Sequence, residues 1–223
     1  MKMITTTAFN KNIKQLQETI LKDDIIQTIE LILLLNGMVH CSIVAKTERP
    51  SLEDHIWDYN DKEAFRGATA KNRYSVAWHL WHSARIEDIC SHAFISGTEQ
   101  VYTKAKYEKR LNIKYRTTGN EFSDGQMNDF NEAIDLKELR EYRNAVGAET
   151  RKIIKGIGIE KLREKVNQDD VNRVLKEGYI GKGSEWLLDF WGRKKIAGII
   201  TMPLTRHILV HLNDCMKILK LKE

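Results

Sequence analysis

The chain has 223 residues, of which 42% are hydrophobic, and its formal net charge is +5 at pH 7. A hydrophobic share near the globular average excludes a disordered or low-complexity chain. Because 2 Pro and 13 Gly are too few turn-forming residues for an all-β protein, we expect a single domain, residues 1–223, built from long helices.

The apolar residues recur with a helical period along almost the whole chain. A short helical stretch from about residue 12 is predicted to lead into a first long helix, residues 23–44. Arg49-Pro50 then opens a loop that carries His55 and Trp57. A second helix, residues 73–95, follows and is stopped by the next two residues, Ser-Gly.

The third helix has clear boundary signals. Asp135, with Glu138 three residues later, is typical of a capping box, and the helix can run to Gly156. The helical period predicts that one face of it is buried, and this stripe consists of Leu139, Tyr142, Val146 and Ile153.

Shorter helices are predicted next, at residues 160–166 and 169–176, and Ser184 can cap another one. Pro203 suits the first turn of a last long helix, residues 203–219. Four long helices with short helical insertions predict an all-α fold, in which the long helices form a four-helix bundle.

Three cysteines, Cys41, Cys90 and Cys215, are widely spaced and form no CxxC motif. This pattern indicates a reducing compartment rather than a disulfide framework or a zinc ribbon. The first ten residues do not resemble a signal peptide, and the longest apolar run, residues 29–39, is too short to span a bilayer. We therefore expect a cytoplasmic protein with no membrane partner.

Histidines provide the clearest chemical signal in the sequence. The chain has seven: His40, His55, His79, His82, His92, His207 and His211. In the last predicted helix, His207 and His211 are four residues apart, so their side chains point the same way. They share that face with Leu204 and Val210, which marks it as inward. Two imidazoles one turn apart on an inward face can bind one metal ion.

The second predicted helix supplies a third imidazole. His82 lies in a stripe with Trp78 and Ile86 and is therefore aimed at the interior. His79 lies about 60° round the helix from it, and His92 about 80°. The predicted metal ligands are thus His82, His207 and His211, a set that accepts several first-row divalent ions. The alternative is that these histidines are hydrogen-bonded core residues.

Two further side chains are candidate neighbours of this site. His40, on the first predicted helix, shares a face with Leu33 and can line the same cavity. Asp214, three residues beyond His211, can act as a fourth ligand or orient a histidine.

Arg85 has two readings. It lies about 60° from His82 and can reach an anionic substrate. It can also form a salt bridge with Glu87 or Asp88, and the salt bridge is the favoured interpretation. Glu87 and Asp88 point away from His82, which disfavours them as general bases.

The tryptophans are interpreted mainly as packing residues. Four of the chain's five tryptophans are meant here: Trp78, Trp81, Trp186 and Trp191. Indole rings at these positions would also shape an apolar pocket.

The two histidine segments resemble motifs of a known group. Residues 75–88, Ser-Val-Ala-Trp-His-Leu-Trp-His-Ser-Ala-Arg-Ile-Glu-Asp, resemble the second-helix motif of the DinB/YfiT-like superfamily. Residues 205–214, Thr-Arg-His-Ile-Leu-Val-His-Leu-Asn-Asp, resemble its last-helix motif. Trp191-Gly192 and the stretch to Met202-Pro203 are similar to a subgroup. The resemblance covers nearly the whole chain, with one histidine motif early and an HxxxH pair near the end.

The resemblance implies an antiparallel four-helix bundle with one divalent ion, often nickel or zinc, held by His82, His207 and His211. Some members transfer low-molecular-weight thiols such as bacillithiol, or isomerise maleylpyruvate with mycothiol, and members are often dimers. This chain departs from the thiol-transferase pattern after His211, where it has Leu212-Asn213-Asp214 in place of Arg-Gly-Gln. The departure disfavours thiol transfer and leaves the three ligands in place.

Three functions remain open at this point. The leading one is a metal-dependent enzyme that acts on a small molecule, with the ion activating a thiol or water for transfer or hydrolysis. The second is a non-catalytic, homodimeric metal-binding or stress-response protein. The third is nucleic-acid binding by the basic, tyrosine-interleaved segment 104–116. It is the least favoured because no nucleic-acid-reading motif accompanies that segment.

Overall fold

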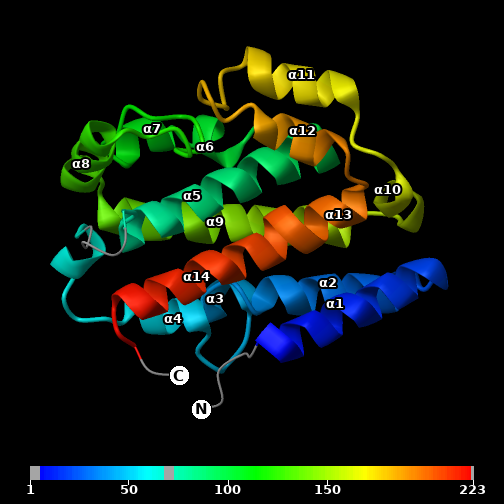
Figure 1. Ribbon diagram of the computed structural model, residues 1–223. Helices are drawn as coiled ribbons and strands as arrows, with labels where there is room; N and C mark the ends of the chain where they lie inside the picture. The colour runs from blue at the N-terminus through cyan, green and yellow to red at the C-terminus, as the bar shows by residue number, and fades with distance from the viewer. Residues whose placement is uncertain (1–5, 68–72, 222–223) are drawn as a thin grey trace.

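The computed structural model describes residues 6–67 and 73–221, and helices connected by loops make up this part of the chain (Figure 1). These residues contain no β-strand, only one isolated bridge between Lys165 and Lys195. The all-α prediction is therefore confirmed. No described helix combines the length and the apolar character that crossing a membrane requires.

The centre of the molecule is α5, Val76–Cys90, and all of its residues are buried. It continues into a π-helical segment, η2, Ser91–Ser96. Alongside α5 lies α9, Leu136–Lys155, and the two helices run in the same direction (Figure 1). Arg143 of α9 donates a 2.9 Å hydrogen bond to Ser83 of α5. This pair of neighbours is thus parallel, which differs from a fully antiparallel arrangement.

The last helix, α14, His207–Ile218, packs along α5 in the opposite direction (Figure 1). The side-chain contacts between them show this direction, because a later residue of α5 meets an earlier residue of α14. His79 lies beside His211, and His82 lies beside His207. The antiparallel packing therefore places the histidines of α5 beside those of α14.

On the far side of α9 lies α2, Ile25–Gly37, which in turn packs against α1, Thr6–Leu21. Asp24 caps α2 by accepting a 3.0 Å hydrogen bond from the Gln27 backbone N–H. The side chain of Arg151 in α9 donates to the Leu33 carbonyl of α2 at 2.8 Å.

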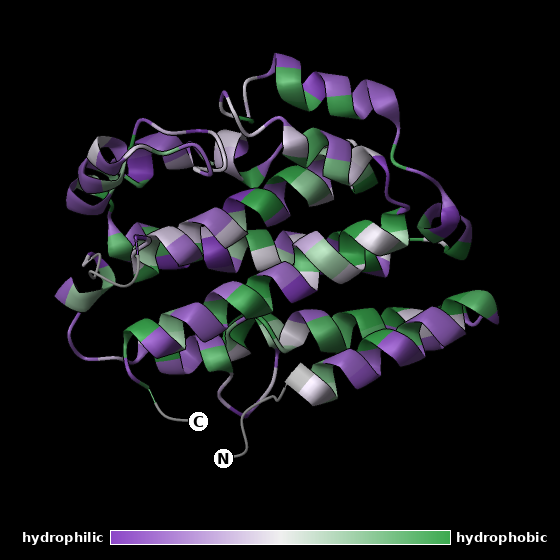
Figure 2. Cartoon of the chain, viewed as in Figure 1, coloured by the Kyte–Doolittle hydropathy of each residue, from purple (hydrophilic) through white to green (hydrophobic). Residues whose placement is uncertain are grey.

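Short helices fill the connections and cover the ends. They are α3 Ser42–Ala45, α4 Leu52–Trp57, η1 Glu63–Phe65, α6 Val101–Lys104, α7 Tyr107–Arg110, α8 Asp124–Ala133, α10 Ile159–Arg163, α11 Gln168–Lys176, α12 Trp186–Gly192, α13 Ile196–Thr201 and the π-helical η3 Met202–Arg206. Figure 2 shows that α11, at the top of the view, carries mostly hydrophilic residues. Its two buried residues are Val171 and Val174.

The N-terminal third differs from the prediction. The first helix already covers Thr6–Leu21, and the predicted helix 23–44 is divided, because α2 ends at Gly37 and α3 follows it. The predicted loop after Pro50 contains α4 instead. Ser51 and Asp54 each accept a hydrogen bond from the other's backbone N–H, and this capping box starts a helix directly after the proline.

The last helix also begins earlier than predicted. Helical structure starts at Ile196 and passes through Pro203 within the π-helical segment η3. Proline has no N–H to donate, and its ring clashes with the carbonyl four residues earlier in a regular α-helix. The wider π turn accommodates it, and the Thr205 hydroxyl donates to the Ile200 carbonyl at 2.9 Å.

The predicted boundaries of α9 agree well with the structure. Asp135 accepts a 3.0 Å hydrogen bond from the Glu138 backbone N–H, and α9 ends one residue before Gly156. Leu139, Tyr142 and Val146 are buried as predicted. At the C-terminal end, Ile153 is only partly buried and Ile154 takes the core position.

An ion pair is buried between α4 and α9. The Arg143 guanidinium donates to Glu53 at 2.7 Å and 3.1 Å, and both side chains are fully buried. Burial alone would raise the pKa of the Glu53 carboxyl, but the Arg143 charge overcomes this and holds the pKa below its usual value. Removing one partner from such a pair leaves an uncompensated buried charge, which typically costs about 3–5 kcal/mol.

Gly147 is a position in α9 where neighbouring side chains leave no room for a Cβ atom. A Cβ atom there would lie 2.6 Å from His40 Nδ1 and 2.9 Å from Val44 Cγ1. We expect Gly147→Ala to lower the free energy of unfolding by about 1–3 kcal/mol, because buried neighbours must move to make room. Urea unfolding followed by circular dichroism measures this change.

The matched control is Gly125→Ala in α8, where an added Cβ meets nothing within 4 Å. This substitution should stabilise the protein by about 0.5–1 kcal/mol, because alanine is the better helix former. Equal effects of the two substitutions would contradict the close contact at Gly147.

Candidate metal centre

Three histidines gather between α5 and α14. His82 of α5 and His207 and His211 of α14 each contribute one ring nitrogen, and these nitrogens all lie within 4.8 Å of one another. The Nε2 atoms of His207 and His211 are 3.0 Å apart. The structure thus brings together the three residues that the sequence analysis selected. We call them the histidine centre.

The ring of His82 is held in one tautomer. Its Nδ1 lies 2.6 Å from the Thr118 carbonyl oxygen, and because a carbonyl can only accept, Nδ1 carries the proton. This leaves Nε2 as the unprotonated nitrogen. The indole of Trp78 stacks on the ring at a centroid distance of 4.3 Å and an angle of 7°. Both contacts fix the direction in which His82 presents Nε2.

Gly119 explains how the Thr118 carbonyl comes so close to α5. Its φ is +75°, a left-handed conformation that favours glycine. A Cβ atom there would lie 2.5 Å from a ring carbon of Trp81 and 2.9 Å from Nε1 of Trp78. Only a residue without a side chain lets this turn pack on the two indoles and reach His82.

His211 has a partner that the sequence analysis set aside. Its Nδ1 lies 2.7 Å from Nδ1 of His79, one turn before His82 in α5. Ring nitrogens of His79 and His211 and a carboxylate oxygen of Asp214 form a second group within 4.8 Å. Asp214 also accepts a 3.0 Å hydrogen bond from Lys217. The spacing of three residues between His79 and His82 is the signal that could have identified His79, because such residues are neighbours on a helix.

Burial keeps the imidazoles of this region neutral. Desolvation lowers the pKa of His82 to about 4 and that of His79 to about 4. The pKa values of His207 and His211 are also lowered, first by burial and then by the neighbouring histidines. Neutral imidazole is the form that binds a metal ion.

The donor set and its spacing fit one divalent ion. Two nitrogens bound at about 2.0–2.1 Å and separated by about 90–109° at the ion lie about 2.9–3.4 Å apart, which matches the 3.0 Å between the Nε2 atoms of His207 and His211. Within the described part of the chain, the buried Nδ1 of His207 has no hydrogen-bond partner. With Nε2 bound to an ion, Nδ1 would carry the proton of this ring, so the ion itself would not supply the missing partner.

His40 lies elsewhere in the core. Its Nε2 is 3.0 Å from the Glu87 carboxylate, and its Nδ1 is 3.8 Å from that of Glu53. It is not part of either ligand group found among the described residues. The prediction that it lines the same cavity assumed one helix from residue 23 to 44, whereas α2 ends before it.

Arg85 has the structural role that the sequence analysis favoured. Its guanidinium is fully buried, 3.4 Å from the Asp88 carboxylate, and donates to the Tyr142 hydroxyl at 3.0 Å. Asp88 also accepts backbone N–H groups of Val101 and Tyr102. These contacts fix the loop after α5 and give Arg85 no contact with the histidine centre.

An apolar cavity of about 130 Å³ opens beside the histidine centre, and His207 forms part of its wall. The aromatic residues Trp186 and Trp191 line it as well. This agrees with the expectation that indole rings at these positions also shape an apolar pocket.

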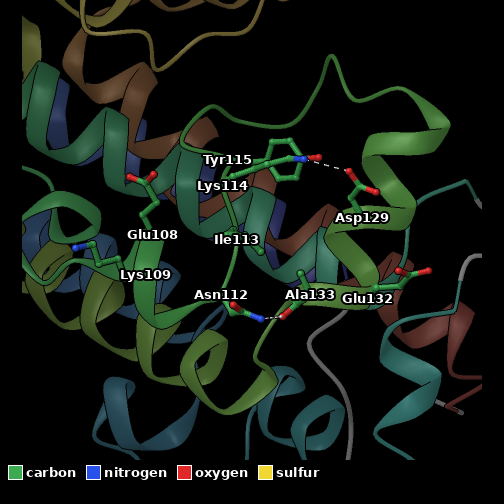
Figure 3. Close-up of a pocket in the computed structure, with 9 residues that line it drawn as sticks. All are labelled: Glu108, Lys109, Asn112, Ile113, Lys114, Tyr115, Asp129, Glu132 and Ala133. Carbon is green, nitrogen blue, oxygen red and sulfur yellow. Dashed lines mark hydrogen bonds and ion pairs between the residues drawn. The ribbon is translucent and has the colours of Figure 1, made fainter.

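A larger, open hollow of about 730 Å³ lies at the basic segment, and Figure 3 shows the residues that line it. Acidic and basic side chains alternate around it, and Lys114 is 3.2 Å from Asp129. Nearby, Arg110 is 2.7 Å from Glu138. These ion pairs neutralise part of the positive charge that nucleic-acid binding would need. No histidine lines this hollow in the described structure.

No protein-family model matches the chain, and no curated protein matches it. The candidate function therefore depends on the residues and the geometry of the centre.

The lowered pKa values predict how stability depends on pH. Between pH 6.5 and about 4, the unfolded chain binds more protons than the folded one at His82 and His79. The free energy of unfolding of the metal-free protein should therefore fall as pH falls through this window. For a shift of this size, each histidine contributes about 2 kcal/mol between pH 7 and pH 5. Urea unfolding at a series of pH values measures the slope.

A variant separates this effect from the general effect of acid. His79→Gln should flatten the slope, whereas His55→Gln, a substitution of a histidine in α4 that belongs to neither ligand group, should leave it unchanged. A stability that is constant between pH 7 and pH 5 would contradict the neutral, buried histidines.

Proposed function

We propose that the protein is a metal-dependent enzyme of the DinB-like group, with one divalent ion held by His82, His207 and His211. The fold proposed with it is a four-helix bundle of DinB/YfiT type, formed by α2, α5, α9 and α14. The two histidine motifs and the order in which they occur support this assignment. We also propose a cytoplasmic location, which the free, buried cysteines Cys41, Cys90 and Cys215 support.

The observation that carries the proposal is the convergence of three neutral imidazoles. Their ring nitrogens lie within 4.8 Å of one another. Imidazole donors without a thiolate or a bridging carboxylate suit nickel and zinc among the first-row ions.

When bound, the ion would lower the pKa of a coordinated thiol or water, so that a nucleophile is available at neutral pH. The protein's own residues prepare the centre for this chemistry. The Thr118 carbonyl fixes the tautomer of His82, and His79 holds the ring of His211 at its Nδ1. Such contacts orient metal ligands and tune their basicity.

Whether the nucleophile is a thiol or water depends on the residues around the centre. Asp214 occupies a position where the resemblance to thiol transferases fails, and its carboxylate lies near His79 and His211. A carboxylate there can accept a proton from water during hydrolysis. Hydrolysis is therefore the version of the proposal that these residues favour, with thiol transfer as its alternative.

A second candidate function follows from the same group of side chains. Because Asp214 lies near His211, its carboxylate can complete the coordination sphere of the ion. A closed site of this kind is typical of structural metals. The protein would then be a non-catalytic metal-binding protein, and the exposed Leu21 and Ile26 would suit a homodimer contact.

Metal analysis tests the centre directly. Protein purified without a histidine tag should contain about one equivalent of nickel or zinc, and His82→Gln or His211→Gln should lower this to below about a tenth. His55→Gln is the matched control and should keep the metal. Inductively coupled plasma mass spectrometry gives the content. A metal-free wild type, or full metal in both cluster variants, would contradict the proposal.

Cobalt substitution distinguishes an open site from a closed one. With Co²⁺ in the centre, 2-mercaptoethanol should produce a sulfur-to-cobalt charge-transfer band if a coordination position is free. We expect this band in the wild type and in Asp214→Asn. A visible spectrum that changes neither with the thiol nor with azide would exclude the enzyme and favour the closed, non-catalytic site.

A further inference from the structure

The cavity beside His207 is built by segments that are distant in sequence. α12 contributes Trp186, Phe190 and Trp191, and the π-helical η3 contributes Met202 and Pro203. Because the π turn accommodates Pro203 within a continuous helix, this apolar wall leads directly into His207. The cavity thus adjoins the histidine centre along the chain as well as in space.

The lining disfavours an anionic ligand. Of the described residues that form the wall, only Asn120 and His207 are polar, and none carries a formal charge at pH 7. A carboxylate or phosphate placed there would lose its hydration without gaining a cationic partner. The wall therefore favours a neutral, apolar group.

The volume limits the size of that group. The cavity measures about 130 Å³, and an apolar protein cavity of about 150 Å³ is known to bind benzene. One aromatic ring or a short branched alkyl chain thus fits, and a larger body does not.

The mouth of the cavity is unusually apolar. Trp186 is 56% exposed and Phe190 is 38% exposed. Large aromatic side chains at the rim of a concave site are typical of ligand recognition, because they lose contact with water when the ligand enters. The Phe190 ring is also in contact with the Lys194 ammonium group, 3.9 Å from its centroid, which restricts its movement.

The polar residues provide one hydrogen-bonding end. The side-chain oxygen of Asn120 accepts a 2.7 Å hydrogen bond from the Thr118 hydroxyl, so its NH₂ group is available as a donor. Asn120 follows the same turn whose Thr118 carbonyl holds His82. A ligand with one polar atom would direct it toward Asn120 and His207 and leave its apolar part among the aromatic residues.

We propose that this cavity binds the ring-sized, uncharged part of the substrate, and that the substrate is a small aromatic or branched-alkyl molecule with one polar group directed at the histidine centre. That the occupant is a substrate rests on the proposed function. Binding of the ring itself requires only the cavity.

The probe for this site is 4-fluorobenzyl alcohol, which has one ring and one hydroxyl, observed by ¹⁹F NMR line broadening. It is titrated into the protein as purified and after metal removal with a chelator, with circular dichroism to verify the fold. We expect binding to both forms.

Trp186→Ala, a substitution at the partly exposed rim, should weaken the binding of the alcohol about tenfold. Leu175→Ala is the control, since Leu175 is 48% exposed on α11 and does not line the cavity. The anionic analogue 4-fluorobenzoate should not bind to the metal-free protein.

Several results would overturn the proposal: no binding of the alcohol to either form, equal binding of the benzoate analogue to the metal-free protein, or no effect of Trp186→Ala. Binding that requires the metal would also overturn it, because the probe would then be held by the ion. Metal content is measured on the same samples. Intact metal without ring binding disproves only the cavity proposal, and ring binding without any metal in the purified protein disproves only the metal-dependent function.

Discussion

The burial of α5 on every side is the constraint on which the rest of the structure depends. This helix carries polar side chains into a region without water, and each needs a partner there. Neighbouring segments supply them: the Thr118 carbonyl for His82, Arg143 for Ser83, His40 for Glu87, and backbone N–H groups after η2 for Asp88. The positions of α9, of the short helix α4 and of the glycine turn at 119 are thus coupled to the polar residues of a single helix.

The polar side chains of α5 differ between its two halves: histidines lie in the first half, and acidic and basic side chains lie in the second. Its first half presents His79 and His82, which burial keeps neutral, and its second half carries the charged Arg85, Glu87 and Asp88. Arg85 and Asp88 form a buried ion pair, and Glu87 lies 3.0 Å from Nε2 of His40, so these side chains connect α5 to its neighbours. The neutral donors face α14, where a cation can bind without competition from a salt bridge. The second half of α5 therefore holds neighbouring segments in place, and the first half supplies the imidazole of His82 to the histidine centre.

The sequence predicts the all-helical fold and the convergence of His82, His207 and His211, because helical period and four-residue spacing are local properties. It does not reveal the role of His79. Rotation round the helix separates inward from outward residues only where one face is buried, whereas every face of α5 is buried. Backbone carbonyls such as that of Thr118 have no sequence signature, and the helix after Pro50 is too short to show a period. The cavity wall combines residues from α12 and η3 with Ile86 of α5, a contact that only tertiary packing determines.

The π turn at η3 has a consequence for the direction of the imidazoles. Each residue of an α-helix turns the chain by about 100°, and a π turn contains one residue more than an α turn, so everything after it is rotated relative to a regular helix. His207 and His211 follow η3 directly. The extra residue in this turn therefore sets the direction of both imidazoles, and removing one residue from η3 would rotate them by about 100° round the helix axis. Met202 and Pro203 of the cavity wall belong to the same segment, so the direction of the imidazoles and the position of this wall depend on one turn of the chain.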